Sequence, residues 1–390
     1  MKIKMVPILG LAIASTSLLG FAPQNARAAT GTVIIVAEGL SPQVLDLGKG
    51  YLRKADEDAE LTTSFDELKD KAKPATVGAD ALAQIKGLLQ AAHDNGYATG
   101  LITTGDVTKV APLFYNLQGD VAADLTAKDA PYEFIAGGGA ANLAGASEKI
   151  AANGGTFVAS SDALDGDLKG RILATEVPGE LNYSLDRDPA QESGLGELAT
   201  AALDTLTAGN KPFVLVIHDS LIAKAVQNRD TPALFEQFRE LNTIVGDAVA
   251  RRDDDPNLKV AALMTGATMS PTFTTQSPEE QNNAYYVASN LDESFTFAGQ
   301  SLKGKTVEDI TAFADVDAGE YKGWKVSEAD KAKIAAGTLD PEIALRASYE
   351  PTLKLNYVAT PSDAYAFTLG FEAPEGLVPA LKAAVATPAK

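Results

Sequence analysis

Short runs of apolar, β-branched residues alternate along this chain with segments of helical periodicity. Buried strands are predicted at 32–37, 98–103, 132–136, 212–217 and 258–264. Apolar residues at helical spacing predict helices over 80–95 and 196–208, and a long helix that Thr231 caps and Pro232 opens. Continuous apolar strands separated by helices are typical of parallel sheets. The sequence therefore predicts an α/β fold, with a mostly parallel sheet covered by helices on both faces.

The stretch from Ser270 to about Glu350 departs from this alternation. It is polar, rich in Thr, Asn and Asp, and shows no clear period until its end. We interpret residues of about 270–350 as an insertion or small subdomain beside the core. Returning strands are predicted over 357–371 and a closing helix over 376–386, and the final Pro-Ala-Lys is expected to fray. The main domain would then span 29–390.

The first 28 residues have the pattern of a signal peptide. Lys2 and Lys4 precede an apolar run over 5–21, and Ala26-Arg27-Ala28 supplies the small-x-small cleavage signal. We expect cleavage before Ala29 and export, with the periplasm as the destination. A retained membrane anchor is the competing interpretation, but glycine and hydroxyl residues dilute the run, which is near the lower limit for a span. With no cysteine in the chain, a lipoprotein anchor and disulfides are both excluded.

Charge and length limit the classes of partner. The mature chain would hold residues 29–390, enough for a large core with an insertion. Loss of the three positive charges of the leader changes the formal net charge from −19 to −22, so nucleic acid and acidic membranes would be repelled. We interpret the charge as a device for solubility. We expect no membrane span after cleavage.

Ligands of open α/β sheets bind outside the carboxyl ends of the strands, which directs attention to five short segments. The predicted strands end in Glu38-Gly39, Thr103–Asp106, Gly137–Gly139, His218-Asp219-Ser220 and 265–268. His218-Asp219-Ser220 does not predict a catalytic triad, because consecutive residues project in different directions. One divalent ion held by Glu38, His218 and Asp219 is chemically reasonable. The glycine triplet favours a tight turn over an anion site.

Six segments in this order resemble the alkaline phosphatase family. They are TVIIVAEGLS (32–41), GYATGLITTGDVTKVAP (96–112), YEFIAGGG (132–139), YSLDRDP (183–189) with PFVLVIHDS (212–220), KVAALMTGATM (259–269) and ATPSDAYAFTLG (359–370). The resemblance implies the fold of that family and a homodimer. It also implies a phosphomonoester hydrolase whose serine nucleophile is flanked by two zinc ions and a magnesium ion.

Carried over position by position, the family's metal ligands are nearly all replaced. The substituted positions are Glu38 for Asp, Ala111 for Thr or Ser, His218 for Glu, Ala223 for Asp, Gln227 for His, Gly266-Ala267 for Asp-His, and Ala359 for His. The nucleophile motif Asp-Ser-Ala is absent between Glu38 and Gly96, where the hydroxyl run Thr62-Thr63-Ser64 stands in an unlike context. No arginine lies between Pro112 and Gly137, where the phosphate-binding one would be expected. The family uses three zinc-binding histidines, whereas the chain has only His93 and His218.

We interpret the chain as a pseudoenzyme that keeps the fold without the nucleophile or the metals. It would need neither zinc nor magnesium, have no catalytic or cofactor-binding residues, and act by binding an unknown protein or small molecule. The alternative is a metal-dependent phosphomonoester hydrolase with a reduced single-ion site at Glu38, His218 and Asp219. A third interpretation is a cell-envelope structural protein whose partner-facing surface is the 270–350 stretch.

Overall fold

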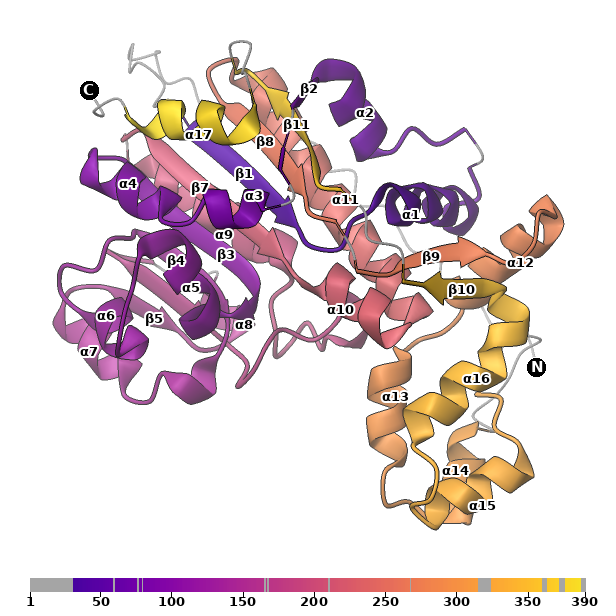
Figure 1. The fold of residues 1–390 in the computed structure, drawn as a ribbon. Helices are drawn as coiled ribbons and strands as arrows, with labels where there is room; N and C mark the ends of the chain where they lie inside the picture. Colours follow the sequence, from indigo (N-terminus) through magenta and orange to yellow (C-terminus); the bar gives the residue numbers. More distant parts are fainter. Residues whose placement is uncertain are drawn as a thin grey trace, which may run out of the picture.

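A nine-stranded sheet forms the centre of the protein (Figure 1). The computed structural model describes residues 31–386, apart from 59, 76, 79, 165, 167, 210, 267, 315–323, 360–362 and 372–375. The predicted signal peptide and the Pro-Ala-Lys end therefore lie outside the described residues. The strands are β1 (Gly31–Ala37), β2 (Lys73–Ala75), β3 (Ala98–Asp106), β4 (Phe134–Gly138), β5 (Thr156–Val158), β6 (Ile172–Thr175), β7 (Phe213–Asp219), β8 (Lys259–Met264), β9 (Ser270–Phe273), β10 (Leu355–Val358) and β11 (Tyr365–Leu369).

The predicted mostly parallel sheet is confirmed. Its strand order is β2-β11-β8-β1-β7-β3-β4-β6-β5. All neighbours from β8 to β5 run parallel, whereas β11 pairs antiparallel with both β8 and β2. Every residue of β1, β3 and β7 is buried, as expected of central strands that are covered on both faces. Their carboxyl ends therefore lie side by side at one edge of the sheet.

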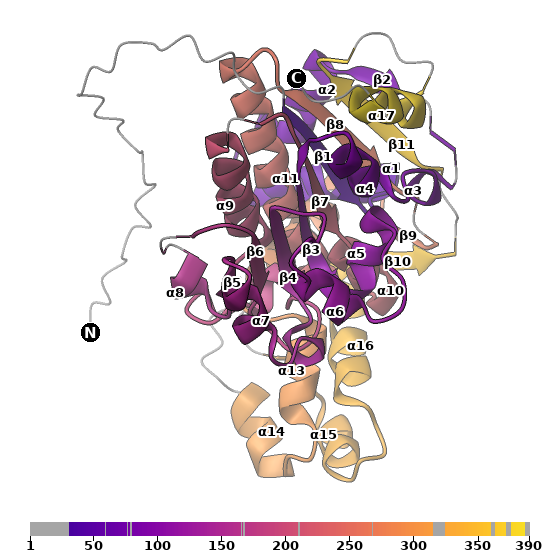
Figure 2. The same ribbon diagram turned by 90° about the vertical axis from the view of Figure 1, so that its left-hand side faces the viewer.

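Helices cover both faces of this sheet (Figure 2). One face packs against α1 (Pro42–Ala55), α2 (Ser64–Lys71), α9 (Leu195–Ala208), α10 (Leu221–Asn228) and α11 (Thr231–Asp254). The other packs against α3 (Ala81–Gln84), α4 (Leu88–Asp94), α5 (Val107–Tyr115), α6 (Val121–Thr126), α7 (Ala146–Ala152) and α17 (Leu377–Ala386). The short elements α8 (Ser161–Leu164), η1 (Ala140–Asn142) and η2 (Ser184–Asp186) lie in the connections.

Two helix predictions need correction. The helix predicted over 80–95 is broken into α3 and α4, because Gly87 adopts a left-handed conformation (φ 71°) and its N–H bonds the carbonyl of Leu113. The cap of α11 is Asp230 rather than Thr231, because the Asp230 carboxylate accepts from the backbone N–H of Ala233. The short strands β2, β5 and β6 were not predicted, since their few residues carry too little alternation to detect.

The segment predicted as an insertion is mostly helical. It contains β9, α12 (Pro278–Ser289), α13 (Phe295–Leu302), α14 (Val307–Ala314), α15 (Glu328–Ala335) and α16 (Pro341–Leu353). Strand β9 pairs antiparallel with β10 in a separate two-stranded sheet, and α13 to α16 project from the core beneath it (Figure 1). The helical pattern was hard to detect because the segment is polar and because α13, α14 and α15 have eight residues each and bury only a few side chains.

Across residues 31–386, gaps excepted, no helix combines the length and the apolar character needed to cross a membrane.

Candidate functional site

Glu38 and His218 come together at the carboxyl ends of β1 and β7. The two strands are parallel neighbours, and the Glu38 N–H donates to the Asp219 carbonyl, which fixes the first residue after β1 beside the end of β7. The Nε2 atom of His218 lies 2.5 Å from Glu38 Oε1. His218 is 2% exposed, whereas the Glu38 side chain is 32% exposed. The carboxylate is thus the only part of this pair that solvent can readily reach.

The second ring nitrogen of His218 is also occupied. Its Nδ1 lies 2.9 Å from Thr103 Oγ1, and that oxygen accepts from the backbone N–H of Gly105. With the ring proton on Nε2, His218 donates a hydrogen bond to Glu38 and accepts one from the Thr103 hydroxyl at Nδ1. Each polar group in this series of hydrogen bonds then has a partner. Phe114 of α5 packs edge-on against the ring. His218 is therefore held between two protein partners and offers no free nitrogen to an ion.

Asp219 points to the opposite face of the sheet, as strand alternation requires. Its Oδ1 accepts from the Leu221 N–H at 2.8 Å and the Thr104 hydroxyl at 3.3 Å, and its Oδ2 accepts from Gln237 of α11 at 3.3 Å. Glu38, His218 and Asp219 therefore do not converge on one point. Among the described residues, no three His, Asp or Glu side chains are grouped so that they could hold a metal ion.

Positions that the resemblance assigns to metal ligands nevertheless meet in space around Glu38. A Cβ on Gly39 would lie 2.5 Å from the Cα of Ala223, so α10 sits directly against the end of β1. The Thr265 N–H donates to the Ala37 carbonyl, which brings the end of β8 and Gly266 beside the same point. Ala223 and Gly266 carry no ligating atom in their side chains, and Ala267 lies outside the described residues.

The remaining predicted positions are spread out or have structural roles. Ala111 is fully buried inside α5, Gln227 is exposed on α10, and Ala359 is exposed after β10. Thr63 caps α2 in a reciprocal capping box with Asp66, so its hydroxyl is engaged. His93 lies in the last turn of α4, as predicted.

The glycine triplet after β4 serves a close backbone approach. A Cβ on Gly138 would lie 1.9 Å from the Gly179 carbonyl oxygen, and Gly139 adopts a φ of 103°. Gly138 is needed because of the packing against the segment after β6, and Gly139 because of its left-handed φ and the Asp106 side chain beside it.

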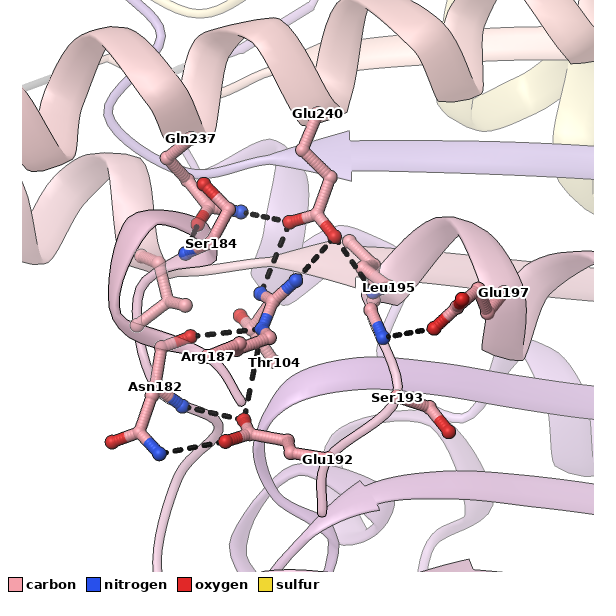
Figure 3. A network of polar contacts seen from close by, with 12 residues as sticks. Thr104, Asn182, Ser184, Arg187, Glu192, Ser193, Leu195, Glu197, Gln237 and Glu240 are labelled. Atoms are coloured by element: carbon pink, nitrogen blue, oxygen red, sulfur yellow. Dashed lines mark hydrogen bonds and ion pairs between the residues drawn. The ribbon is translucent and has the colours of Figure 1, made fainter. Parts of the chain in front are cut away.

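A buried polar network surrounds Arg187 on the α11 side of the sheet (Figure 3). The guanidinium forms a two-pronged ion pair with Glu240, with Nη2 3.0 Å from Oε2, and its Nε donates to the Asn182 carbonyl at 3.1 Å. Glu192 Oε1 lies 3.6 Å from the same Nε. The side chains of Arg187 and Glu192 are only 7% and 3% exposed. A buried cation thus holds two carboxylates together.

The network continues to Asp219. Gln237 donates from Nε2 to both Glu240, at 2.8 Å, and Asp219, while its Oε1 accepts from the Ser184 N–H. Burial acts to lower the pKa of Arg187, but the charges of Glu240 and Glu192 raise it overall. Burial also raises the pKa of Asp219 to about 6, and the nearby Glu240 charge adds to that rise.

Sequence reasoning missed this network, although it did single out YSLDRDP. The motif supplies Arg187, but Glu192 and Glu240 come from a loop and from α11, and nothing in their local sequence marks them as partners. An arginine in a run of acidic residues is the only signal that was available.

No family model matches the chain. A curated relative, alkaline phosphatase 4 of Bacillus subtilis (strain 168), is 24% identical over 276 residues, which are 65% of this chain and 59% of that protein. The match therefore spans less than two thirds of the relative's length.

Two solved structures show the same architecture. The alkaline phosphatase of Thermus thermophilus aligns with a TM-score of 0.72 at 16% identity, covering 90% of each chain. The cold-active alkaline phosphatase of a Shewanella species aligns with a TM-score of 0.70 at 18% identity, covering 87% of this chain and 94% of that one. The protein has an alkaline-phosphatase-like fold.

Proposed function

We propose that this protein uses an alkaline-phosphatase-like scaffold for binding rather than for phosphate-ester hydrolysis. The observation that carries the proposal is that His218, at the edge where the strands end, is hydrogen-bonded to Glu38 through one ring nitrogen and to Thr103 through the other. Both ring nitrogens are engaged, and the neighbouring positions that would complete a metal site carry alanine and glycine. Zinc and magnesium are then not required.

The charge distribution supports the same conclusion. Phosphoryl transfer needs positive charge at the reacting group, from metal ions or arginine, to stabilise the transition state. The arginine near this edge is Arg187, which is 7% exposed and already paired with Glu240 and Glu192. If it turned to a phosphate, Glu240 and Glu192 would lose their cationic partner, which costs about 3–5 kcal/mol.

Hydrolysis of an aryl phosphate tests the proposal directly. The purified protein, supplied with zinc and magnesium, should turn over no faster than an EDTA-treated sample. Glu38→Gln and His218→Ala should behave like the wild type, and His93→Ala provides a matched variant at the other histidine. Turnover that is removed by EDTA and by Glu38→Gln, but not by His93→Ala, would establish the single-ion hydrolase instead.

The proposal also includes export of the protein and formation of a homodimer. Because of the cleavage pattern at Ala26 and Ala28, we place the mature protein in the periplasm with Ala29 as its first residue. Mass spectrometry of the exported protein should find no residue before Ala29. The resemblance also suggests a homodimer, which light scattering at micromolar concentration would detect as twice the monomer mass. The partner would be a protein or a small molecule, identified by what co-purifies.

A further inference from the structure

A hollow of about 420 Å³ is lined by residues from the carboxyl-terminal ends of α10 and α16, from β10 and from the residue after β9. Arg229 and Lys354 line it together with Thr274, Glu350, Asn356 and Tyr357. Its volume suits a small organic molecule. All of these residues belong to described parts of the chain.

Arg229 and Lys354 reach the hollow from unusual backbone conformations. Each ends a helix, α10 and α16 respectively, in the left-handed region, with φ of 53° and 54°. Helices that end this way usually carry glycine there, because a Cβ costs about 1 kcal/mol in that conformation. The described residues contain four such strained non-glycine positions, and two of them line this one hollow. Both carry long cationic side chains where glycine would be more stable.

The positive charge in the hollow is poorly compensated. The Arg229 guanidinium has no ion pair or hydrogen bond with any residue that the structure describes. Lys354 approaches Glu280 only at 3.8 Å, with its side chain 38% exposed. Glu350 is the carboxylate in the lining. Of the two cations in the lining, Arg229 is therefore the one without an acidic partner among the described residues.

A third cation, Arg346, lies next to the hollow but does not line it. A narrow crevice that shares Arg229, Leu355 and Tyr357 with the hollow is also lined by Arg346. Burial raises the pKa of the Tyr357 hydroxyl and the charge of Asp230 adds to that rise, while the charges of Arg346 and Arg229 act against it. Arg346 donates to the Asn228 carbonyl at 2.6 Å and is thereby fixed. Arg346 also forms an ion pair with Glu342 at 3.7 Å, so Arg229 and Lys354 are the cations that the hollow itself offers to a ligand.

We propose that this hollow binds a small organic oxyanion, through a phosphate or carboxylate group. The guanidinium of Arg229 offers parallel N–H donors that match such a group, and the ammonium of Lys354 adds a second charge. Asn356 is an additional polar side chain in the lining, and Pro351 and Leu355 provide apolar surface for the body of the ligand. Binding here is independent of whether the strand-edge residues can hydrolyse a phosphate ester.

Titration calorimetry with inorganic phosphate and with citrate tests the site. At least one of the two should bind, with an affinity that falls as salt is added. Arg229→Gly and Lys354→Gly should each weaken binding roughly tenfold to a hundredfold, as expected for loss of a charged hydrogen bond. Glycine suits the left-handed conformation, so these variants should fold at least as well as the wild type. Asn116→Gly changes another left-handed helix end, after α5, and should bind like the wild type.

Each outcome has a defined meaning. Binding of phosphate alone identifies a phosphorylated ligand, binding of citrate alone identifies a carboxylate, and binding of both supports the shared oxyanion chemistry. Absence of heat with both probes overturns the proposal. Binding that Arg229→Gly and Lys354→Gly leave unchanged, in variants whose circular dichroism matches the wild type, overturns it as well.

Discussion

At the scale of single residues, the buried carboxyl of Asp219 makes the free energy of unfolding depend on pH. It has no exposed surface, and burial raises the pKa of its carboxyl to about 6 from the ordinary 3.8. Between these two values the native state holds a proton that the unfolded chain releases. This carboxyl therefore makes the free energy of unfolding fall as the pH rises through that interval. Below pH 3.8 both states are protonated, and the stabilising effect is fully present.

We expect Asp219→Asn to remove part of this dependence. The difference in free energy of unfolding between the variant and the wild type should change by about 1–3 kcal/mol, in favour of the variant, as the pH rises from 4 to 7. Urea denaturation at several pH values measures it. Asp230, also buried with a pKa of about 6, remains in both proteins and cancels in the comparison. Asp188→Asn, at an exposed carboxyl, serves as the control, and parallel curves for Asp219→Asn would contradict the assignment.

Strand alternation was enough to predict that His218 and Asp219 diverge, because consecutive residues of a strand face opposite sides. It was not enough to find what each side chain meets. Glu38 lies 180 positions from His218 in the sequence, and Gln237, which bonds Asp219, belongs to α11. Pairing of this kind depends on the strand order β8-β1-β7-β3, which apolar periodicity does not specify.

At the scale of elements, α10 depends on one glycine for its position. Gly39 has a φ of 78°, and an added Cβ would lie 2.5 Å from the Cα of Ala223. Gly39→Ala should therefore destabilise the protein by about 2–4 kcal/mol, through backbone strain and a displaced helix. Gly119→Ala separates the two effects, because Gly119 has a similar φ of 83° with no atom within 4 Å of its Cβ position. Gly119→Ala should cost only about 1 kcal/mol in chemical denaturation. If the two variants lost equal stability, α10 could move away from the added Cβ without cost.

Asp230 joins α11 to the projecting helices. Its carboxylate caps α11 and also accepts from the backbone N–H groups of Phe295 and Thr296 and from the Thr296 hydroxyl, at the start of α13. Asp230→Ala should cost about 3–5 kcal/mol, because several buried donors lose their partner at once. Asp120→Ala removes an exposed cap from the short helix α6 and should cost about 1 kcal/mol. Thermal unfolding of the two variants measures the difference, and similar losses would mean that the contact with α13 contributes nothing.

The sequence could predict the five main parallel strands to within a few residues, since strands such as β1 and β7 are continuous apolar runs. It did not predict covering helices such as α1, α5 and α10. The break between α3 and α4 could not be predicted, because apolar spacing continues across Gly87 while contacts with α5 impose the turn. The helices of the insertion were missed for a different reason. Helices α13, α14 and α15 are short and bury few residues, so their period is lost in a polar background.

At the scale of the whole molecule, we expect stability to be independent of divalent metals. If the protein had a working zinc site, zinc at a thousandfold excess over its Kd would add about 4 kcal/mol to the free energy of unfolding. The melting temperature would then rise by several degrees. EDTA, zinc and magnesium should each leave the melting temperature within about one degree of the untreated value. A zinc-dependent increase that His218→Ala abolishes would instead show that the Glu38 and His218 pair opens to accept an ion.

Both margins of the main sheet are short strands, β2 at one side and β5 at the other, each of three residues. Pro74 in the middle of β2 has no N–H to offer a further strand, and Lys73 beside it adds charge. A second chain would therefore find little unpaired backbone on which to extend the sheet. We therefore do not expect partners to extend the main sheet by β-augmentation, and fibril formation through its margins should be resisted in concentrated solutions.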